Sequence, residues 1–264
     1  MIRYDLHLHS DRSDGEHPPD EVLRRCARGG LDVVAITDHD IVPAFEPGLR
    51  NVEGRDIRVI AALEASGVHD GAELHFLIYF PGPVPSDFAL FSRRQVEARV
   101  ERYDAAAGKL GLPLADESAR SGQRALTRHH LARALIAAGR AKHIHDAFAR
   151  FVGTGCGNVP PFTVTAGEVI DAARQSGGLV SWAHPGRDQV DRWLAQLVAL
   201  GLQGVEGIRP SLTSRDRRVY RDAARRHGLF LTGGSDWHGW HDLDPGLFAV
   251  ERDSIASFAD LLAD

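Results

Sequence analysis

Short apolar runs alternate with amphipathic segments over residues 1–85 and again over residues 163–264. The runs are rich in Val, Ile and Leu and have the lengths of buried strands. They span residues 2–9, 32–37, 57–64, 74–80, 178–183, 204–208, 229–233 and 246–250. The amphipathic segments predict helices over residues 19–28, 165–175, 190–200, 214–227 and 254–262. Strands that alternate with helices predict an α/β fold with parallel sheet, closed or nearly closed into a barrel.

Residues 86–162 interrupt this alternation. The pattern there predicts one long charged helix over residues 86–111 and two shorter helices over residues 127–139 and 141–153, with no strand. We therefore expect a barrel domain formed by residues 1–85 and 163–264, with a helical insertion at residues 86–162. A helical lobe over the carboxyl end of a barrel would cover the active site and select the substrate.

Charge and cysteine content narrow the choice of partners and compartment. The 264 residues carry a net charge of −5, so we expect no broad basic surface and no stable binding of duplex nucleic acid. Two cysteines give no disulfide framework and suit a reducing compartment. The start of the chain lacks the pattern of a signal peptide, and no apolar run reaches membrane-spanning length. We expect a cytoplasmic protein without a membrane partner.

Histidines and acidic residues recur at the ends of the predicted strands. They are His7, His9, Asp14, His39, Glu64, His75, His184, Asp236 and His238. Any one of these histidines, taken alone, is more often a core or surface residue than a ligand. Several strands deliver ligand types to the same end, however, and imidazole and carboxylate are the usual ligands of divalent metals. The set therefore predicts a multinuclear metal site.

The composition of this ligand set favours catalysis over a structural metal cluster. Structural sites fill their coordination with protein ligands and favour cysteine, whereas this set contains only histidine and carboxylate. Two metals about 3.5–4 Å apart share and activate a hydroxide and clamp the oxygens of an in-line displacement at phosphorus. The same chemistry also serves amide hydrolysis, so the ligand set by itself leaves both reactions open.

The insertion carries a segment suited to binding an anion. Thr127 is placed to cap a helix that starts at Arg128, and Arg133 follows on that helix. A capped helix start with arginine side chains is a ready anion site. The alternative is a solvated amphipathic helix, and spacing alone does not separate the two.

The metal motifs resemble those of the PHP (polymerase and histidinol phosphatase) family of metal-dependent phosphoesterases. The matching motifs are His-Leu-His-Ser with Ser-Asp-Gly, Ile-Thr-Asp-His-Asp, Leu-Glu, His75, Ala-His-Pro and Ser-Asp-Trp-His, in the family's order. The resemblance implies a distorted seven-stranded β/α barrel with two or three metals, manganese first and zinc, iron or magnesium as alternatives. It implies one metal on His7, His9, Glu64 and Asp236, a second on Glu64, His75 and His184, and a third on Asp14, His39 and His238.

Within that family the insertion is similar to that of the 3′,5′-nucleoside bisphosphate phosphatases. The resemblance implies that Thr127, Arg128 and Arg133 hold a substrate phosphate and that Arg187 clamps a phosphate beside the metals. Relatives carry lysine near Cys156, a charge that cysteine cannot supply, and Arg209 is a candidate replacement that is equally well explained as a loop residue. His130 is a candidate general acid because of its place in the phosphate-binding segment.

These features together predict a metal-dependent phosphohydrolase. The expected substrate is a small nucleotide, foremost the 3′-phosphate of a 3′,5′-bisphosphonucleoside, or the end of a short oligonucleotide. One alternative is a histidinol-phosphate-type monoester phosphatase, which the helical insertion disfavours. Others are an amidohydrolase-like hydrolase, disfavoured by the arginines, and a non-catalytic metal-bound module, disfavoured by the complete ligand set.

Overall fold

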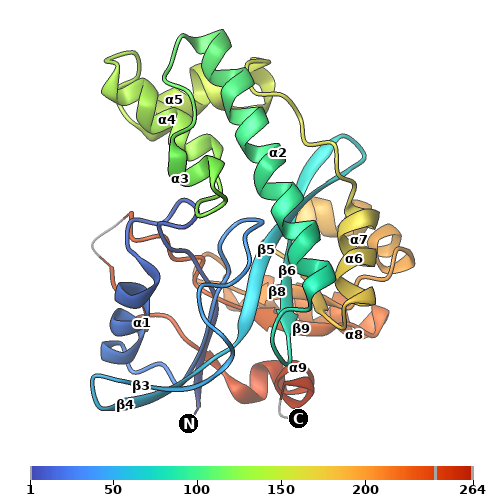
Figure 1. Cartoon of the computed structure of the whole chain (residues 1–264). Helices are drawn as coiled ribbons and strands as arrows, with labels where there is room; N and C mark the ends of the chain where they lie inside the picture. The colour runs from blue at the N-terminus through green and yellow to red at the C-terminus, as the bar shows by residue number, and fades with distance from the viewer. Residues whose placement is uncertain (1, 241–242, 263–264) are drawn as a thin grey trace.

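The strands form two five-stranded sheets in the computed structural model, which describes residues 2–240 and 243–262 (Figure 1). The first sheet has the order β10-β1-β2-β4-β3, and the second has the order β5-β6-β7-β8-β9. The strands of the first sheet are β1 (Arg3–Leu8), β2 (Val33–Ile36), β3 (Gly48–Val52), β4 (Arg55–Val59) and β10 (Val250–Glu251). Those of the second are β5 (Ala61–His69), β6 (Ala72–Phe80), β7 (Leu179–Trp182), β8 (Gly204–Ile208) and β9 (Phe230–Gly233).

The expectation of a wholly parallel sheet is wrong in part. β1, β2 and β4 are parallel to one another, and so are β7, β8 and β9. β6, however, is antiparallel to both β5 and β7, and β3 with β4 forms a hairpin that the apolar pattern did not predict. A tight turn at Asp70–Gly71 joins β5 to β6, which leaves no room for the crossover helix that parallel neighbours need.

Two isolated bridges join the sheets at the end of the molecule where the predicted ligands lie. His39 pairs with Glu64, and Leu8 pairs with Trp237. Backbone hydrogen bonds reinforce the second junction, from Asp236 N to His7 O at 2.9 Å and from His9 N to the Trp237 carbonyl at 2.8 Å. The chain therefore has a mixed α/β fold in which the carboxyl ends of β1, β2 and β9 converge.

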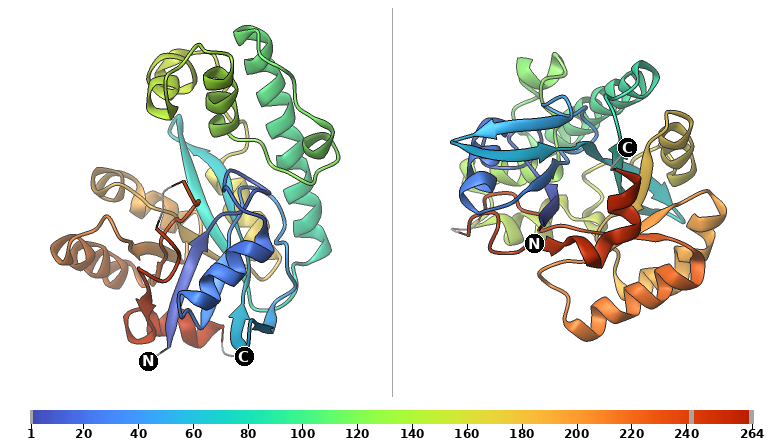
Figure 2. Two further views of the ribbon diagram at one scale, coloured as in Figure 1. Left: turned by 90° about the vertical axis from the view of Figure 1, so that its left-hand side faces the viewer. Right: turned by 90° about the horizontal axis from the view of Figure 1, so that it is seen from below.

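The interior between the sheets is apolar and is covered at the opposite end by α9 (Ala256–Leu261). Side chains from both sheets meet there, among them Leu6, Leu77 and Tyr79. Phe258 of α9 is fully buried, and its ring centroid lies 4.8 Å from that of Tyr79. Figure 2 shows α9, in red, crossing this end of the molecule. Burial of this apolar surface keeps water out of the interior beneath the site.

Four further helices cover the outer faces of the sheets. They are α1 (Pro19–Arg28), α6 (Ala166–Gln175), α7 (Arg187–Ala199) and α8 (Ser214–His227). Each lies where the amphipathic pattern predicts it, and α6 begins with a capping box between Thr165 and Glu168. The last predicted strand is reduced to the two residues of β10.

Residues 86–162 contain helices and turns but no strand. The elements are α2 (Ser86–Leu110), α3 (Glu117–Arg120), α4 (Arg128–Ala137), α5 (Ile144–Ala147), a π-helical turn (Phe148–Val152) and a short 3-10 turn (Thr154–Cys156). α2 leads away from the sheets to a lobe that holds α3, α4 and α5 (Figure 1). The predicted helix over residues 141–153 ends early as an α-helix, and the π-helical turn continues it.

A separate apolar cluster stabilises this lobe. It includes Leu110 of α2, Leu131 and Leu135 of α4, and Val152 of the π-helical turn. Within the described part of the chain, no helix is long and apolar enough to cross a membrane. Cys26 is buried and Cys156 half-buried, and both are free thiols.

Candidate metal centre and substrate cavity

All nine predicted ligands come together where the two sheets join. Four overlapping groups have ligand atoms within 4.8 Å of one another: His9, Asp14, His39 and His238; His7, Glu64 and His184; His7, His9 and Asp236; and His39, Glu64 and His75. The overlap arises because Glu64, His7, His9 and His39 each face two groups. A multinuclear centre needs such shared ligands.

Two imidazole nitrogens and two carboxylate oxygens surround one point. They belong to His7, His9, Glu64 and Asp236, which we call the first group. His7 Nε2 lies 3.1 Å from His9 Nε2. Glu64 Oε2 is 3.3 Å from His7 Nε2 and 3.2 Å from His9 Nε2, and Asp236 Oδ1 is 3.3 and 3.4 Å from the same two atoms. Ligands about 2.0–2.1 Å from a tetrahedral metal stand about 3.3 Å apart, so this spacing matches a metal site.

The second group, formed by Glu64, His75 and His184, uses the other oxygen of Glu64. Glu64 Oε1 lies 2.8 Å from His184 Nε2 and 3.1 Å from His75 Nδ1, and these two nitrogens are 3.3 Å apart. Glu64 is 1% exposed and presents one oxygen to each group. Its position between the two groups is that of a bridging carboxylate.

The third group, formed by Asp14, His39 and His238, has longer distances between its ligand atoms. Asp14 Oδ1 lies 3.3 Å from His238 Nε2, and Asp14 Oδ2 lies 3.6 Å from His39 Nε2. His9 Nδ1 also reaches this group, at 3.8 Å from Asp14 Oδ1. The resemblance does not assign His9 a role here, so this proximity comes from the fold alone.

Several buried polar atoms in the centre have no hydrogen-bond partner of their own. Asp14 Oδ1 and His39 Nδ1 are buried and make no hydrogen bond among the residues that the structure describes. The two Nε2 atoms of His7 and His9 face each other, and when neither carries a proton they cannot satisfy one another. Buried polar atoms are normally satisfied, so a cation between these atoms resolves both conflicts. The residues present therefore fit divalent metals.

The charges of the centre also favour a cation. Burial opposes protonation of the histidines, but Glu64 and its neighbouring carboxylates outweigh it and raise the pKa of both His9 and His75 to about 10. The same centre lowers the pKa of Asp14 and Glu64, against the effect of burial, through the surrounding imidazoles. A metal binds in place of the protons that the two histidines would otherwise retain.

Two ligands have left-handed backbone conformations that the surrounding structure imposes. The φ angles are +32° for His184 and +56° for Asp236. Such conformations cost of order 1–3 kcal/mol each, and they recur at functional sites. The His184 amide is held by Glu206 Oε2 at 2.7 Å, and Gly234 fits against His7 because a Cβ there would lie 2.4 Å from the His7 Cβ.

Glu206 is a supporting residue that the sequence did not single out. It is fully buried on β8, and its Oε1 lies 3.0 Å from His7 Nδ1, on the side of the ring away from Glu64. A carboxylate on the far nitrogen of a ligand histidine fixes the tautomer and the ring orientation. Asp38 has a different role, because it accepts hydrogen bonds from Ser10 and Ser13 rather than from an imidazole. The sequence places Glu206 in the middle of the apolar run over residues 204–208, and an acidic residue inside a predicted buried strand is the one signal that it offers.

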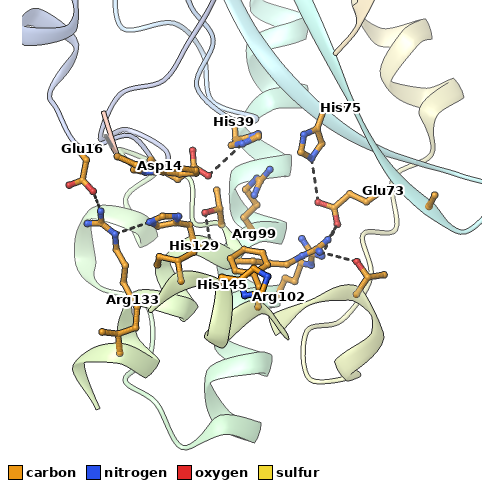
Figure 3. Close-up of a pocket in the computed structure, with 18 of the residues that line it drawn as sticks. Asp14, Glu16, His39, Glu73, His75, Arg99, Arg102, His129, Arg133 and His145 are labelled. Atoms are coloured by element: carbon orange, nitrogen blue, oxygen red, sulfur yellow. Dashed lines mark hydrogen bonds and ion pairs between the residues drawn. The ribbon is translucent and has the colours of Figure 1, made fainter. Parts of the chain in front are cut away.

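A cavity of about 1090 Å³ extends from the metal centre into the helical lobe (Figure 3). Asp14, His39 and His75 line one end. The walls carry the guanidinium groups of Arg99, Arg102, Arg128 and Arg133, and the lobe adds the apolar side chains of Ile136, Ile144 and Phe148. The cavity therefore combines metal ligands, cations and an apolar surface.

The predicted phosphate-binding segment begins α4 as expected. Thr127 caps the helix by accepting the His129 amide at 3.1 Å. Arg128 points into the cavity, where it pairs with Glu73 and donates to Thr154 Oγ1 at 3.1 Å. Arg133 also lines the cavity, but its guanidinium is paired with Glu16 and donates to His129 Nε2 at 2.9 Å.

His130, the candidate general acid, lies in the cap of α4. It does not line the cavity, and its Nδ1 accepts the Thr127 amide at 3.1 Å, so the ring completes the helix cap. Burial lowers the pKa of His130 to about 4. The imidazole is therefore neutral near pH 7 and has no readily released proton to donate.

Two more residues predicted to bind substrate, Arg187 and Arg209, lie outside the cavity lining, and so does Cys156. Arg187 is exposed at the start of α7. Arg209 donates to the Pro185 carbonyl at 3.0 Å, next to the ligand His184. The Cys156 thiol faces the Phe148 carbonyl, at 3.6 Å.

The residues that complete the cavity carry no recognisable motif in the sequence. Arg102 of α2 supplies a cation that no motif marked, and Glu73 of β6 pairs with it at 2.9 Å. Trp240 stacks on His129, with ring centroids 4.3 Å apart, and its indole donates to the Asp14 carbonyl at 2.8 Å. α2 contains several arginines, and helix periodicity does not distinguish Arg102 from the others. Only the folded structure places Arg102 in the cavity wall.

Comparisons with known proteins agree with this site. A PHP domain model matches residues 5–133. The 5′-3′ exoribonuclease Rnm of Escherichia coli is 31% identical over 253 residues, which cover 90% of this chain and 85% of that protein. The 3′,5′-nucleoside bisphosphate phosphatase of Chromobacterium violaceum is 28% identical and covers 90% and 88%. A solved metal-dependent phosphoesterase structure from Bifidobacterium adolescentis matches with a TM-score of 0.79 at 26% identity and covers 99% and 96%.

The chain belongs to the PHP family. It is a metal-dependent phosphoesterase, as the ligand motifs and the arginine-lined cavity predict.

Proposed function

We propose that the protein hydrolyses the 3′-phosphoester of a nucleotide that also carries a 5′-phosphate, and that it releases a 5′-nucleotide. The foremost substrate is a 3′,5′-bisphosphonucleoside. The observation that carries this proposal is the single cavity that joins metal ligands at one end to Arg102 and Arg128 in its wall. Two separate anion-binding regions in one cavity suit a substrate with two phosphates.

The nine predicted ligands hold two or three divalent metals, with manganese as the proposed metal. Such metals supply Lewis acidity and an activated water for in-line displacement at phosphorus. Glu64 lies between the first and second groups of ligands and presents one oxygen to each, and Glu206 orients His7. In this proposal the 3′-phosphate lies at the end lined by Asp14, His39 and His75.

Arg128 and Arg102 bind the 5′-phosphate. Arginine forks make paired, charge-assisted hydrogen bonds to phosphate oxygens. Arg102 is held in place because its guanidinium lies over the Phe162 ring, 4.0 Å from the centroid. It supplies the cation that Cys156 cannot. The base would lie against the apolar part of the lobe at Ile136, Ile144 and Phe148.

A second candidate function is removal of nucleotides from the 5′ end of a short single-stranded oligonucleotide. The name of the Escherichia coli relative favours it, and the bond cleaved is the same 3′-ester. The two functions differ only in whether the 3′-phosphate is terminal or is linked to a further nucleotide. We propose that both substrates are small and single-stranded and that the protein acts in the cytoplasm.

Phosphate or nucleotide release by the manganese-reconstituted protein tests the proposal. The substrates are adenosine 3′,5′-bisphosphate, 5′-AMP, a short 5′-phosphorylated RNA and histidinol phosphate. We expect the bisphosphate or the RNA to exceed 5′-AMP in kcat/KM by at least tenfold, since 5′-AMP lacks the 3′-ester. A preference for histidinol phosphate, or no release from any of the four substrates, would refute the proposed substrate class.

A further inference from the structure

Glu73 lies between the metal centre and the two arginines of the proposed 5′-phosphate site (Figure 3). Its Oε2 accepts from Arg102 at 2.9 Å and also from Arg128. Its Oε1 faces His75 Nε2 at 3.5 Å, and His75 Nδ1 faces Glu64. One carboxylate therefore contacts both arginines and the outer nitrogen of a predicted ligand.

The other arginines of the cavity are engaged differently. Arg99 is paired with the buried Asp40, and Arg133 is paired with Glu16. Only Glu73 neutralises two cavity arginines at once among the residues that the structure describes. An incoming anion can therefore bind Arg102 and Arg128 in full only by displacing this carboxylate.

We propose that Glu73 occupies the place of the substrate's 5′-phosphate between Arg102 and Arg128 until substrate binds, so that its carboxylate competes with the phosphate for these two arginines. This inference rests on the proposed function of the cavity. Glu73 is 19% exposed and lies two residues after the turn that joins β5 to β6, so its side chain has solvent to turn into. It is a competitor within the binding site, not a catalytic residue.

The outcome of this competition depends on the charges exchanged. A phosphate monoester carries −1.5 to −2 charges near pH 7 and three acceptor oxygens, whereas a carboxylate carries one charge and two oxygens. Replacing Glu73 by a terminal phosphate therefore adds charge and an acceptor between the arginines. A phosphodiester carries a single charge, so the exchange gains nothing. Charge-assisted hydrogen bonds differ enough to give a preference of roughly tenfold or more.

Equilibrium binding to the full-length, metal-free protein tests the inference. The probes are 5′-AMP and its phosphate O-methyl ester, titrated by calorimetry in the presence of EDTA at pH 7.5. We expect the wild-type protein to bind 5′-AMP at least tenfold more tightly than the methyl ester. We expect Glu73→Gln to bind both probes roughly tenfold more tightly than wild type does, because neither probe then has to displace a carboxylate from the two arginines.

Two further variants complete the test. Glu16→Gln removes a different cavity carboxylate and should leave both affinities unchanged, which separates displacement of Glu73 from a general loss of negative charge. Arg102→Gln should weaken 5′-AMP binding by tenfold or more. The inference is overturned if Glu73→Gln binds both probes no more tightly than wild type does, if Glu16→Gln tightens binding equally, or if neither probe binds. Because the assay involves neither metal nor turnover, its failure leaves the hydrolysis test of the proposed function independent.

Discussion

A buried ion pair between Arg99 and Asp40 joins α2 to the sheets. Arg99 is 3% exposed, and its Nε donates to Asp40 Oδ2 at 2.6 Å. Its other nitrogens donate to the Leu126 carbonyl and to Ser66 Oγ, each at 2.9 Å. The guanidinium thus connects the helical lobe, β5 and the turn after the ligand His39.

Replacing Arg99 by Met should destabilise the protein strongly. Met preserves much of the volume but leaves the Asp40 carboxylate buried without its cation. Removing one partner of a buried pair costs about 3–5 kcal/mol. The Leu126 carbonyl also loses a donor, which adds to this cost. We expect a loss of about 4 kcal/mol in the free energy of unfolding, measured by urea denaturation with tryptophan fluorescence and circular dichroism.

Two variants make the experiment decisive. Arg94→Met changes an exposed arginine of the same helix and should alter stability by no more than about 0.5 kcal/mol. The double variant Arg99→Met/Asp40→Asn removes the stranded charge and should recover at least about 1 kcal/mol relative to Arg99→Met. A loss below about 1 kcal/mol for Arg99→Met, or a double variant no more stable than the single one, would show that the pair does not hold the lobe.

Three further predictions concern the metal centre and α4. Glu206→Gln should weaken manganese binding about 10–100-fold in calorimetry, because His7 loses its orienting carboxylate; a change under threefold would contradict this role. Burial lowers the pKa of His130 to about 4, so the stability that the neutral ring contributes is present above about pH 6.5 and is lost as the pH falls to 4. His130→Gln should therefore reduce the loss in free energy of unfolding between pH 6.5 and pH 4 by up to about 3 kcal/mol, and it should leave kcat at pH 7.5 within about twofold of wild type. A loss as large as that of wild type would disprove the burial argument. Gly234→Ala should lower both stability and metal affinity, because its Cβ would lie 2.4 Å from the His7 Cβ, and a melting temperature equal to wild type would refute this.

The sequence by itself determined which residues the centre contains. Histidine and carboxylate at the ends of apolar runs are a local signal, because a strand end is recognisable from its own neighbours. His7, Glu64 and Asp236 are far apart in the chain, yet each could be identified where it stands. The helical nature of residues 86–162 was equally predictable, since helix periodicity depends on residues three and four apart.

Tertiary structure decided what surrounds that centre. Glu73, Arg102 and Glu206 belong to a strand or a helix whose pattern explains them without any function, and they meet the site only because distant segments pack together. The antiparallel β6 was also beyond the local pattern, because an apolar run has the same composition in either direction. The fold likewise placed His130 in a helix cap and Arg133 in an ion pair with Glu16, since partners of such side chains are chosen by proximity in space and not in sequence.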